Sequence, residues 1–132
     1  MLQFSPNLIA ATDINPYRIC KMSTTNFAGA PATATTDYVV GVTDGSTRRF
    51  DATLHAASAT ADPISLQPSN CVQIEAGAAI ATAGIGLMPT TGGKAITVTG
   101  STVVPMFVSL EAAPNDGVIF WAYRLPATKG LA

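Results

Sequence analysis

Turn-forming residues interrupt this chain so often that no long helix fits between them. Pro, Gly, Asn and Asp residues divide the sequence into short segments, and no convincing amphipathic helix separates one strand-like segment from the next. The segments themselves alternate apolar and polar residues or are rich in Val, Ile and Thr, which is typical of strands. The sequence therefore predicts an all-β fold, a compact β-barrel or β-sandwich of short strands with an extended N-terminal arm.

The length of 132 residues fits one domain. Prolines, asparagines and an aspartate break up the start, so we expect an extended arm over residues 1–16. A single β domain is expected over residues 17–126, and a C-terminal tail over residues 127–132, because Pro126 ends the last strand.

Several segments have the pattern of strands, and two others leave alternatives open. The expected strands are Tyr17–Met22, Tyr38–Thr43, Cys71–Glu75, Lys94–Gly100, Thr102–Leu110 and Val118–Leu125. Asn26–Thr36 is expected as a loop or a weak strand. Ala78–Ala83 is expected as a strand or irregular segment, with a short helix as the alternative because alanine favours helices.

The chain carries very little charge. Charged residues make up 11% of the sequence, against about 25% in an average domain, and the net charge is −1. The adjacent bases Arg48 and Arg49 are flanked by Asp44 and Asp51, so no basic patch for nucleic acid or for a membrane surface is expected. The N-terminus lacks the pattern of a secretory signal, and we expect a protein made and used without export.

The low charge also bears on assembly. A free monomer keeps itself apart from other molecules with a charged surface of mixed sign, whereas this chain is 48% hydrophobic. The composition therefore favours a subunit of an assembly over a freely diffusing enzyme.

The sequence shows no pattern of an active site. No nucleophile elbow accompanies His55, which is the one histidine, and no phosphate-binding loop occurs. Glu75 and Glu111 each follow an apolar strand, where a solvated turn residue is expected. We predict no catalytic residue and no cofactor.

The two cysteines do not form a metal-binding motif. Cys20, Cys71 and His55 are too few soft ligands for zinc, so no metal site is predicted. We interpret both cysteines as small buried hydrophobic residues, with a disulfide between them as the alternative.

Aromatic residues gather in the last predicted strand. Phe120 and Ala122 should face one side of this strand, and Trp121 and Tyr123 the other, with one set filling the core. The second set, with the adjacent Arg124, is a candidate interface because Trp, Tyr and Arg anchor protein contacts.

Several phrases of the sequence resemble a known family. The run Val103–Gly117, which includes "Ser-Leu-Glu-Ala-Ala-Pro-Asn-Asp-Gly", is similar to a recurring phrase of tailed-phage capsid decoration (cement) proteins. Tyr38–Gly45 resembles their "Val-Gly-Val-Thr-Asp-Gly", and Val72–Ile80 followed by the turn Gly92–Ala95 resembles their entry to a second hairpin. The resemblance covers roughly residues 38–125. The pair Met106 and Phe107 departs from it, because the family often has a small residue there.

The resemblance implies a small all-β protein without an active site, bound to the outer surface of an icosahedral phage head. Its partners would be the major capsid protein and copies of itself, as a homotrimer, with no nucleic acid or membrane involved. It would be made in the host cytoplasm and would stabilise contacts between capsid subunits. Another structural β subunit, from a tail, fibre or surface layer, is the alternative, and a small ligand-binding module or enzyme is a further one. The candidate interface residues are Leu2, Phe4, Leu8, Ile9, Arg48, Arg49, Trp121, Tyr123 and Arg124.

Overall fold

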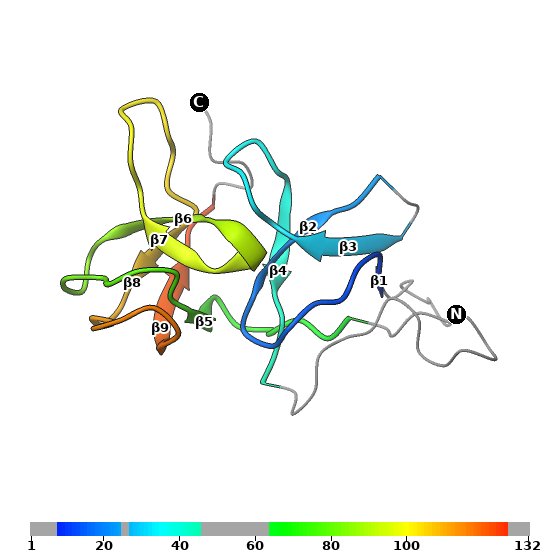
Figure 1. Cartoon of the computed structure of the whole chain (residues 1–132), viewed down its shortest axis with the longest axis horizontal. Coiled ribbons are helices and arrows are strands. Elements are labelled where there is room, and N and C mark those ends of the chain that lie inside the picture. The colour runs from blue at the N-terminus through cyan, green and yellow to red at the C-terminus, as the bar shows by residue number, and fades with distance from the viewer. Residues whose placement is uncertain (1–7, 25–26, 46–63, 127–132) are drawn as a thin grey trace.

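Two β-sheets make up the computed structural model, which describes residues 8–24, 27–45 and 64–126 (Figure 1). The first sheet has the order β1 (Ile9–Ala10), β3 (Ala28–Pro31), β2 (Ile19–Met22) and β4 (Val39–Val42). The second has the order β5 (Cys71–Glu75), β9 (Ile119–Arg124), β8 (Phe107–Ser109), β6 (Gly86–Pro89) and β7 (Ala95–Thr97). Strand pairs within the sheets are antiparallel, except that β1 runs parallel to β3.

The five-stranded sheet curls until its two ends meet. Ala76, directly after β5, forms a parallel bridge with Ala95 at the start of β7, and the amide of Gly77 donates to the Ala95 carbonyl at 2.8 Å. The sheet therefore closes into a small barrel, seen on the left in Figure 1, and the four-stranded sheet packs beside it. The predicted all-β fold is confirmed.

The strands lie close to where the turns of the sequence place them. β5 coincides with the predicted Cys71–Glu75, and a strand lies within each of the other predicted segments. Ala78–Ala83 is irregular, as the first interpretation had it, with Ile80 bridged to Ala113. The strand β6 was not predicted. The described residues contain no α-helix, and their one helical turn is the 3-10 helix η1 (Thr91–Gly93). No helix in this part of the chain is long and apolar enough to cross a membrane.

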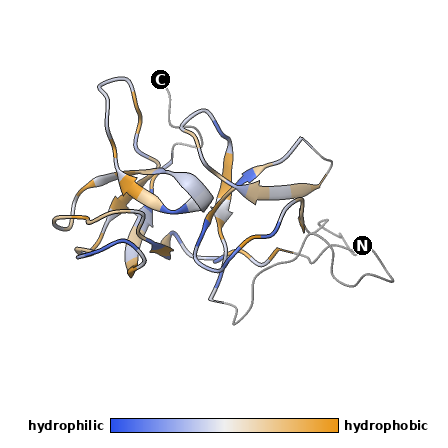
Figure 2. Ribbon diagram, viewed as in Figure 1, coloured by the Kyte–Doolittle hydropathy of each residue, from blue (hydrophilic) through white to orange (hydrophobic). Residues whose placement is uncertain are grey.

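One hydrophobic core joins both sheets. Ile19, Val39 and Val42 of the four-stranded sheet pack with the interior of the barrel, where Phe107 and Phe120 are the largest fully buried side chains. Hydrophobic segments (orange in Figure 2) recur in the strands that surround this core. Met106 and Phe107, the departure from the family phrase, are thus both core residues.

A second, smaller cluster covers the other side of the four-stranded sheet. It contains Ala10, Ile14, Cys20 and Ile64, with Leu66 packed against it. The amide of Ile64 donates to the carbonyl of residue 8 at 2.7 Å, so two distant segments close over the sheet together.

This packing changes the picture of the N-terminal segment. Residues 8–16, the described part of the predicted arm, are extended but are built into the domain, because Ala10 pairs with β3 and Ile14 is fully buried. Local sequence patterns cannot predict this packing, because the partners of Ala10 and Ile14 are Ile64 and Leu66, which lie far away in the sequence.

Candidate interaction surface

The last strand presents apolar side chains to solvent on one side. The side chains of Ile119, Trp121 and Tyr123 are 36%, 44% and 40% exposed, whereas Phe120 and Ala122 are buried in the barrel. The predicted division of this strand into a core side and an outer side is confirmed. β9 lies between β5 and β8 in the sheet, so its outer side is the middle of a wider surface.

Neighbouring strands extend this surface. Directly paired residues share a side of the sheet, and Tyr123 pairs with Cys71 on β5 and with Val108 on β8. Trp121 pairs with Gln73, and its carbonyl accepts from the amide of Leu110, which is 46% exposed. We name this surface the β9 face. It consists of Cys71, Gln73, Val108, Leu110, Ile119, Trp121 and Tyr123, with Glu75, which pairs with Ile119, at one end.

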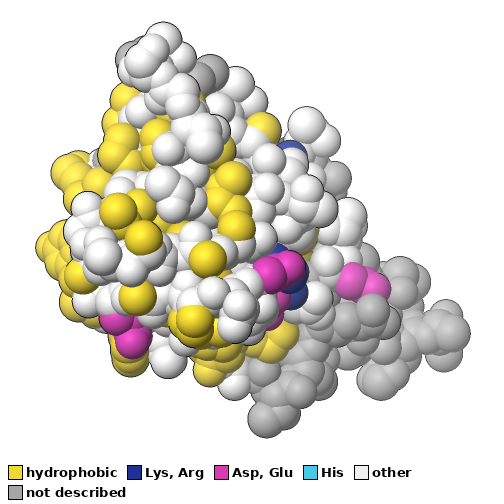
Figure 3. Space-filling model, turned by 60° about the vertical axis from the view of Figure 1, so that its left-hand side comes forward, with side chains coloured by type: hydrophobic (Ala, Val, Ile, Leu, Met, Phe, Trp, Pro, Cys, Tyr) yellow, Lys and Arg dark blue, Asp and Glu magenta, His cyan; other side chains and the backbone are white. Residues whose placement is uncertain are grey.

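Charge is scarce at the β9 face. Glu111, next to Leu110, turns its carboxylate back to accept from the Trp121 amide at 2.9 Å. The barrel side of the molecule as a whole shows mainly apolar and uncharged side chains (Figure 3). Sequence reasoning named Trp121 and Tyr123 but missed the neighbours on β5 and β8, whose contribution follows from the strand register.

Arg124 has a structural position and does not belong to the β9 face. Its guanidinium donates to the carbonyls of Val40 at 3.2 Å and Val39 at 3.4 Å. The side chain thus connects the end of β9 to the edge of β4. Arg124, a candidate interface residue of the sequence analysis, therefore lies at the junction of the two sheets, where two backbone carbonyls bind its guanidinium.

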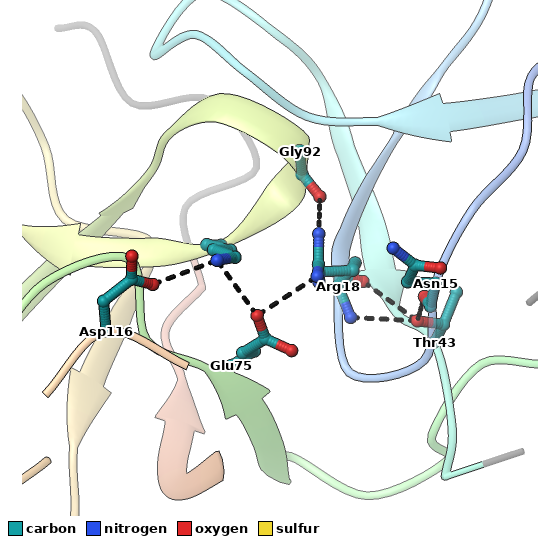
Figure 4. Close-up of polar contacts among 7 residues, drawn as sticks. Asn15, Arg18, Thr43, Glu75, Gly92 and Asp116 are labelled. Carbon is teal, nitrogen blue, oxygen red and sulfur yellow. Dashed lines mark hydrogen bonds and ion pairs between the residues drawn. The ribbon is translucent and has the colours of Figure 1, made fainter. Parts of the chain in front are cut away.

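A network of four charged residues connects the two sheets at the barrel closure (Figure 4). One oxygen of Glu75 accepts from Arg18 and from Lys94, both at 3.1 Å, and Lys94 also contacts Asp116 at 2.9 Å. The hydrogen bond to Asp116, then that to Glu75, raises the pKa of Lys94 above its ordinary value. Glu75 is half-buried, so its interpretation as a solvated turn residue is wrong.

Arg18 also binds the backbone of the barrel. Its guanidinium donates to the carbonyl of Gly92 at 2.9 Å, while its Nε is buried without a partner. Gly93 lies so close to the backbone of Ile19 that an added Cβ would stand 2.6 Å from the Ile19 carbonyl oxygen. Gly93 has φ of +82°, a conformation that glycine adopts without strain. The turn at residues 91–93 therefore packs directly on β2.

The open edge of β5 is covered by a side chain. The amide group of Gln67 accepts from the Gln73 amide at 2.8 Å and donates to the Gln73 carbonyl at 2.7 Å and the Thr43 carbonyl at 3.0 Å. The side chain thus takes the place of a neighbouring strand. No sequence pattern distinguished Gln67, because its partners are backbone atoms.

The remaining predicted interface residues do not join the β9 face. Ile9 is 38% exposed but lies on the four-stranded sheet, and Leu8 is half-buried against the second cluster. Leu2, Phe4, Arg48 and Arg49 lie outside the described residues, as does His55.

The two cysteines have different environments and are not joined. Cys20 is fully buried, and burial raises the pKa of its thiol to about 12, despite a backbone hydrogen bond at Thr43 that lowers it. Cys71 is exposed, so its interpretation as a buried hydrophobic residue is wrong. Among the described residues, no group of three His, Cys, Asp or Glu side chains could hold a metal ion.

Comparison with known proteins gives a fold relative. The chain matches no protein-family model, and no curated protein matches it in sequence. Its structure is similar to that of the N base of the head fiber protein gp8.5 of bacteriophage phi29, with a TM-score of 0.69 and 16% sequence identity. The match covers 96% of this chain and 95% of that chain. At this identity the likeness is one of fold.

Proposed function

We propose that this chain is a structural protein of a phage virion, a decoration protein that binds the outer surface of the head. The observation that carries the proposal is the fold similarity to a phage head fiber base over nearly the whole length of both chains. The sequence phrases at Tyr38–Gly45 and Val103–Gly117, found independently, resemble phage decoration proteins.

The physical basis of such a role is linkage. A protein that binds the assembled shell more tightly than free subunits stabilises the shell, and many copies multiply the effect. The proposed partners are the major capsid protein and copies of this chain as a homotrimer, made in the host cytoplasm. The β9 face, Ile9 and the N-terminal residues Leu2 and Phe4 are the surfaces we propose for these contacts.

A second candidate function is the base of a head fibre. The fold relative favours it, since that protein is the N base of a head fiber of a phage. A fibre base also attaches to the head, but it carries a further structure outward. The two roles differ in whether the chain alone stabilises the shell.

The test uses heads of the phage whose genome encodes the chain, prepared without the protein. Purified protein is mixed with these heads, sedimented, and counted per shell. Stoichiometric binding together with a raised melting temperature of the shell supports the decoration role. Binding without shell stabilisation favours the fibre base. Absence of binding contradicts both proposals.

A further inference from the structure

A cavity of about 380 Å³ lies on the four-stranded sheet, and none of its lining residues belongs to the β9 face. Its volume falls within the range of about 300–1,000 Å³ that is typical of small-molecule sites. All four strands of this sheet, or residues directly next to them, line the cavity. The lining residues that carry functional groups for a ligand include Thr12, Lys21, Thr24, Thr36, Asp37 and Tyr38.

The charges of this cavity balance each other. Lys21 and Asp37 are the only charged residues among the described residues that line it, and Lys21 Nζ lies 3.5 Å from Asp37 Oδ1. Asp37 Oδ2 accepts from the amides of Thr33 at 3.0 Å and Ala34 at 3.1 Å, which holds the carboxylate in one orientation. Since each carboxylate oxygen can accept two hydrogen bonds, Oδ1 retains the capacity to accept one from a ligand. The cavity therefore offers an oriented acceptor without a net charge.

Hydroxyl groups surround this acceptor. Thr12, Thr24 and Thr36 line the cavity and are exposed to solvent. A threonine hydroxyl can donate one hydrogen bond and accept two. A ligand that matches such a lining carries several groups that also both donate and accept, as the hydroxyls of a polyol do.

An exposed aromatic ring completes the cavity. Tyr38 directly precedes β4 and is 60% exposed, the largest value among the large apolar side chains of the described residues. The face of an aromatic ring carries partial negative charge and attracts the weakly positive hydrogens of C–H groups. The ring therefore favours a ligand that has a flat C–H surface beside its polar groups.

We propose that this cavity binds a neutral saccharide, a function beyond attachment to a phage head. A pyranose ring has a C–H face for Tyr38 and a rim of hydroxyls for Asp37 and the threonines. A purely apolar ligand would bury the Asp37 carboxylate and the hydroxyls without partners, which is costly. An ionic ligand would have to compete with the contact between Lys21 and Asp37.

The test uses four probes, the methyl glycosides of glucose, galactose, mannose and N-acetylglucosamine, each mixed with the purified full chain. Saturation-transfer difference NMR detects binding, and the shifts of backbone amides during a titration locate it. At least one probe should bind in the millimolar range, which is usual for a ligand of this size. The shifting amides should be those of residues 11–12, 21–24 and 36–38. Binding should not depend on the sodium chloride concentration, because the ligand is neutral.

A matched set of variants assigns the binding to the aromatic ring. Tyr38→Ala should weaken binding about tenfold or more, because it removes the aromatic surface from the cavity. Tyr38→Phe keeps the ring and should bind nearly as well as the wild type. Phe27→Ala is the control, since Phe27 is 58% exposed and directly precedes β3 of the same sheet but does not line the cavity. Circular dichroism checks that the three variants fold.

The inference is overturned if none of the four glycosides binds, or if the shifting amides lie outside the cavity. It is also overturned if Tyr38→Ala binds as tightly as Phe27→Ala. These measurements contain no phage heads, and the six residues named above are not among those proposed to contact the head. Their failure therefore leaves the attachment to heads to the sedimentation experiment, and failure of that experiment leaves saccharide binding standing.

Discussion

Replacing Gln67 by methionine should destabilise the protein by about 3 kcal/mol. Methionine keeps the length of the side chain but removes three hydrogen bonds, two to Gln73 and one to the Thr43 carbonyl. Each such bond contributes about 1 kcal/mol, and a backbone group that is left buried without a partner costs about 1–3 kcal/mol. Gln67 and Gln73 are half-buried, so water can bond to the backbone groups that lose their partner. The expected loss therefore stays at about three times 1 kcal/mol.

Urea unfolding followed by circular dichroism measures this change in the free energy of unfolding. Gln73→Thr is the control, because the contacts of residue 73 with Gln67 are made by its backbone and survive the substitution. It should change stability by less than about 1 kcal/mol. Gln67→Glu keeps one acceptor but turns a carboxylate toward two carbonyls, so it should be as unstable as the methionine variant at neutral pH. If Gln67→Met proved no less stable than Gln73→Thr, the edge-covering role of Gln67 would be refuted.

Three further predictions concern stability and attachment. Arg124→Met should lower the free energy of unfolding by about 2 kcal/mol, because two carbonyls of β4 lose their donor, yet leave the molar mass in solution unchanged. Deleting residues 1–7 should weaken binding to heads. Deleting residues 1–12 removes β1, its pairing with β3 and the backbone hydrogen bond from Ile64 to residue 8, and should destabilise the domain by about 3 kcal/mol or more in urea unfolding. The free energy of unfolding should fall as the pH rises from about 9, the ordinary pKa of a thiol, toward 12. In this range the Cys20 thiol stays protonated in the folded state, where its pKa is raised to about 12, but ionises in the unfolded state. Cys20→Ala should show a shallower fall in the same pH titration.

Local sequence patterns predicted strands that have one buried side and one exposed side, because their apolar and polar residues alternate. The alternation from Ile119 to Arg124 placed Phe120 and Ala122 in the core, and the structure agrees. Strand β6 escaped prediction because Gly86 and Pro89 are turn formers. Gly86 is explained by Pro105, since an added Cβ would approach the Pro105 Cβ to 3.0 Å. That contact depends on how β6 and the segment before β8 meet, which neighbouring residues do not reveal.

The charged contacts were the least predictable part. Glu75 precedes Ala76 and Gly77, a local sequence typical of a turn, and was expected to be solvated. Its partner Arg18 directly precedes β2, and its partner Lys94 directly precedes β7. Only the closure of the barrel brings these two residues to Glu75. Of the candidate surface, the sequence predicted only Trp121 and Tyr123, because their alternation with buried residues can be seen within one strand. The residues that β5 and β8 add depend on strand register.

The place of β9 in the barrel has a consequence for folding in the cell. β9 is the last described strand to be synthesised, yet it lies between β5 and β8, and Arg124 at its end secures β4 of the other sheet. A partly synthesised chain that ends before Ile119 therefore lacks the strand that pairs with both β5 and β8. Such long-range pairing is slow, and it exposes apolar strands until it is complete. We expect both sheets to form in one step after synthesis has passed residue 124, and shortened chains to depend on chaperones until then.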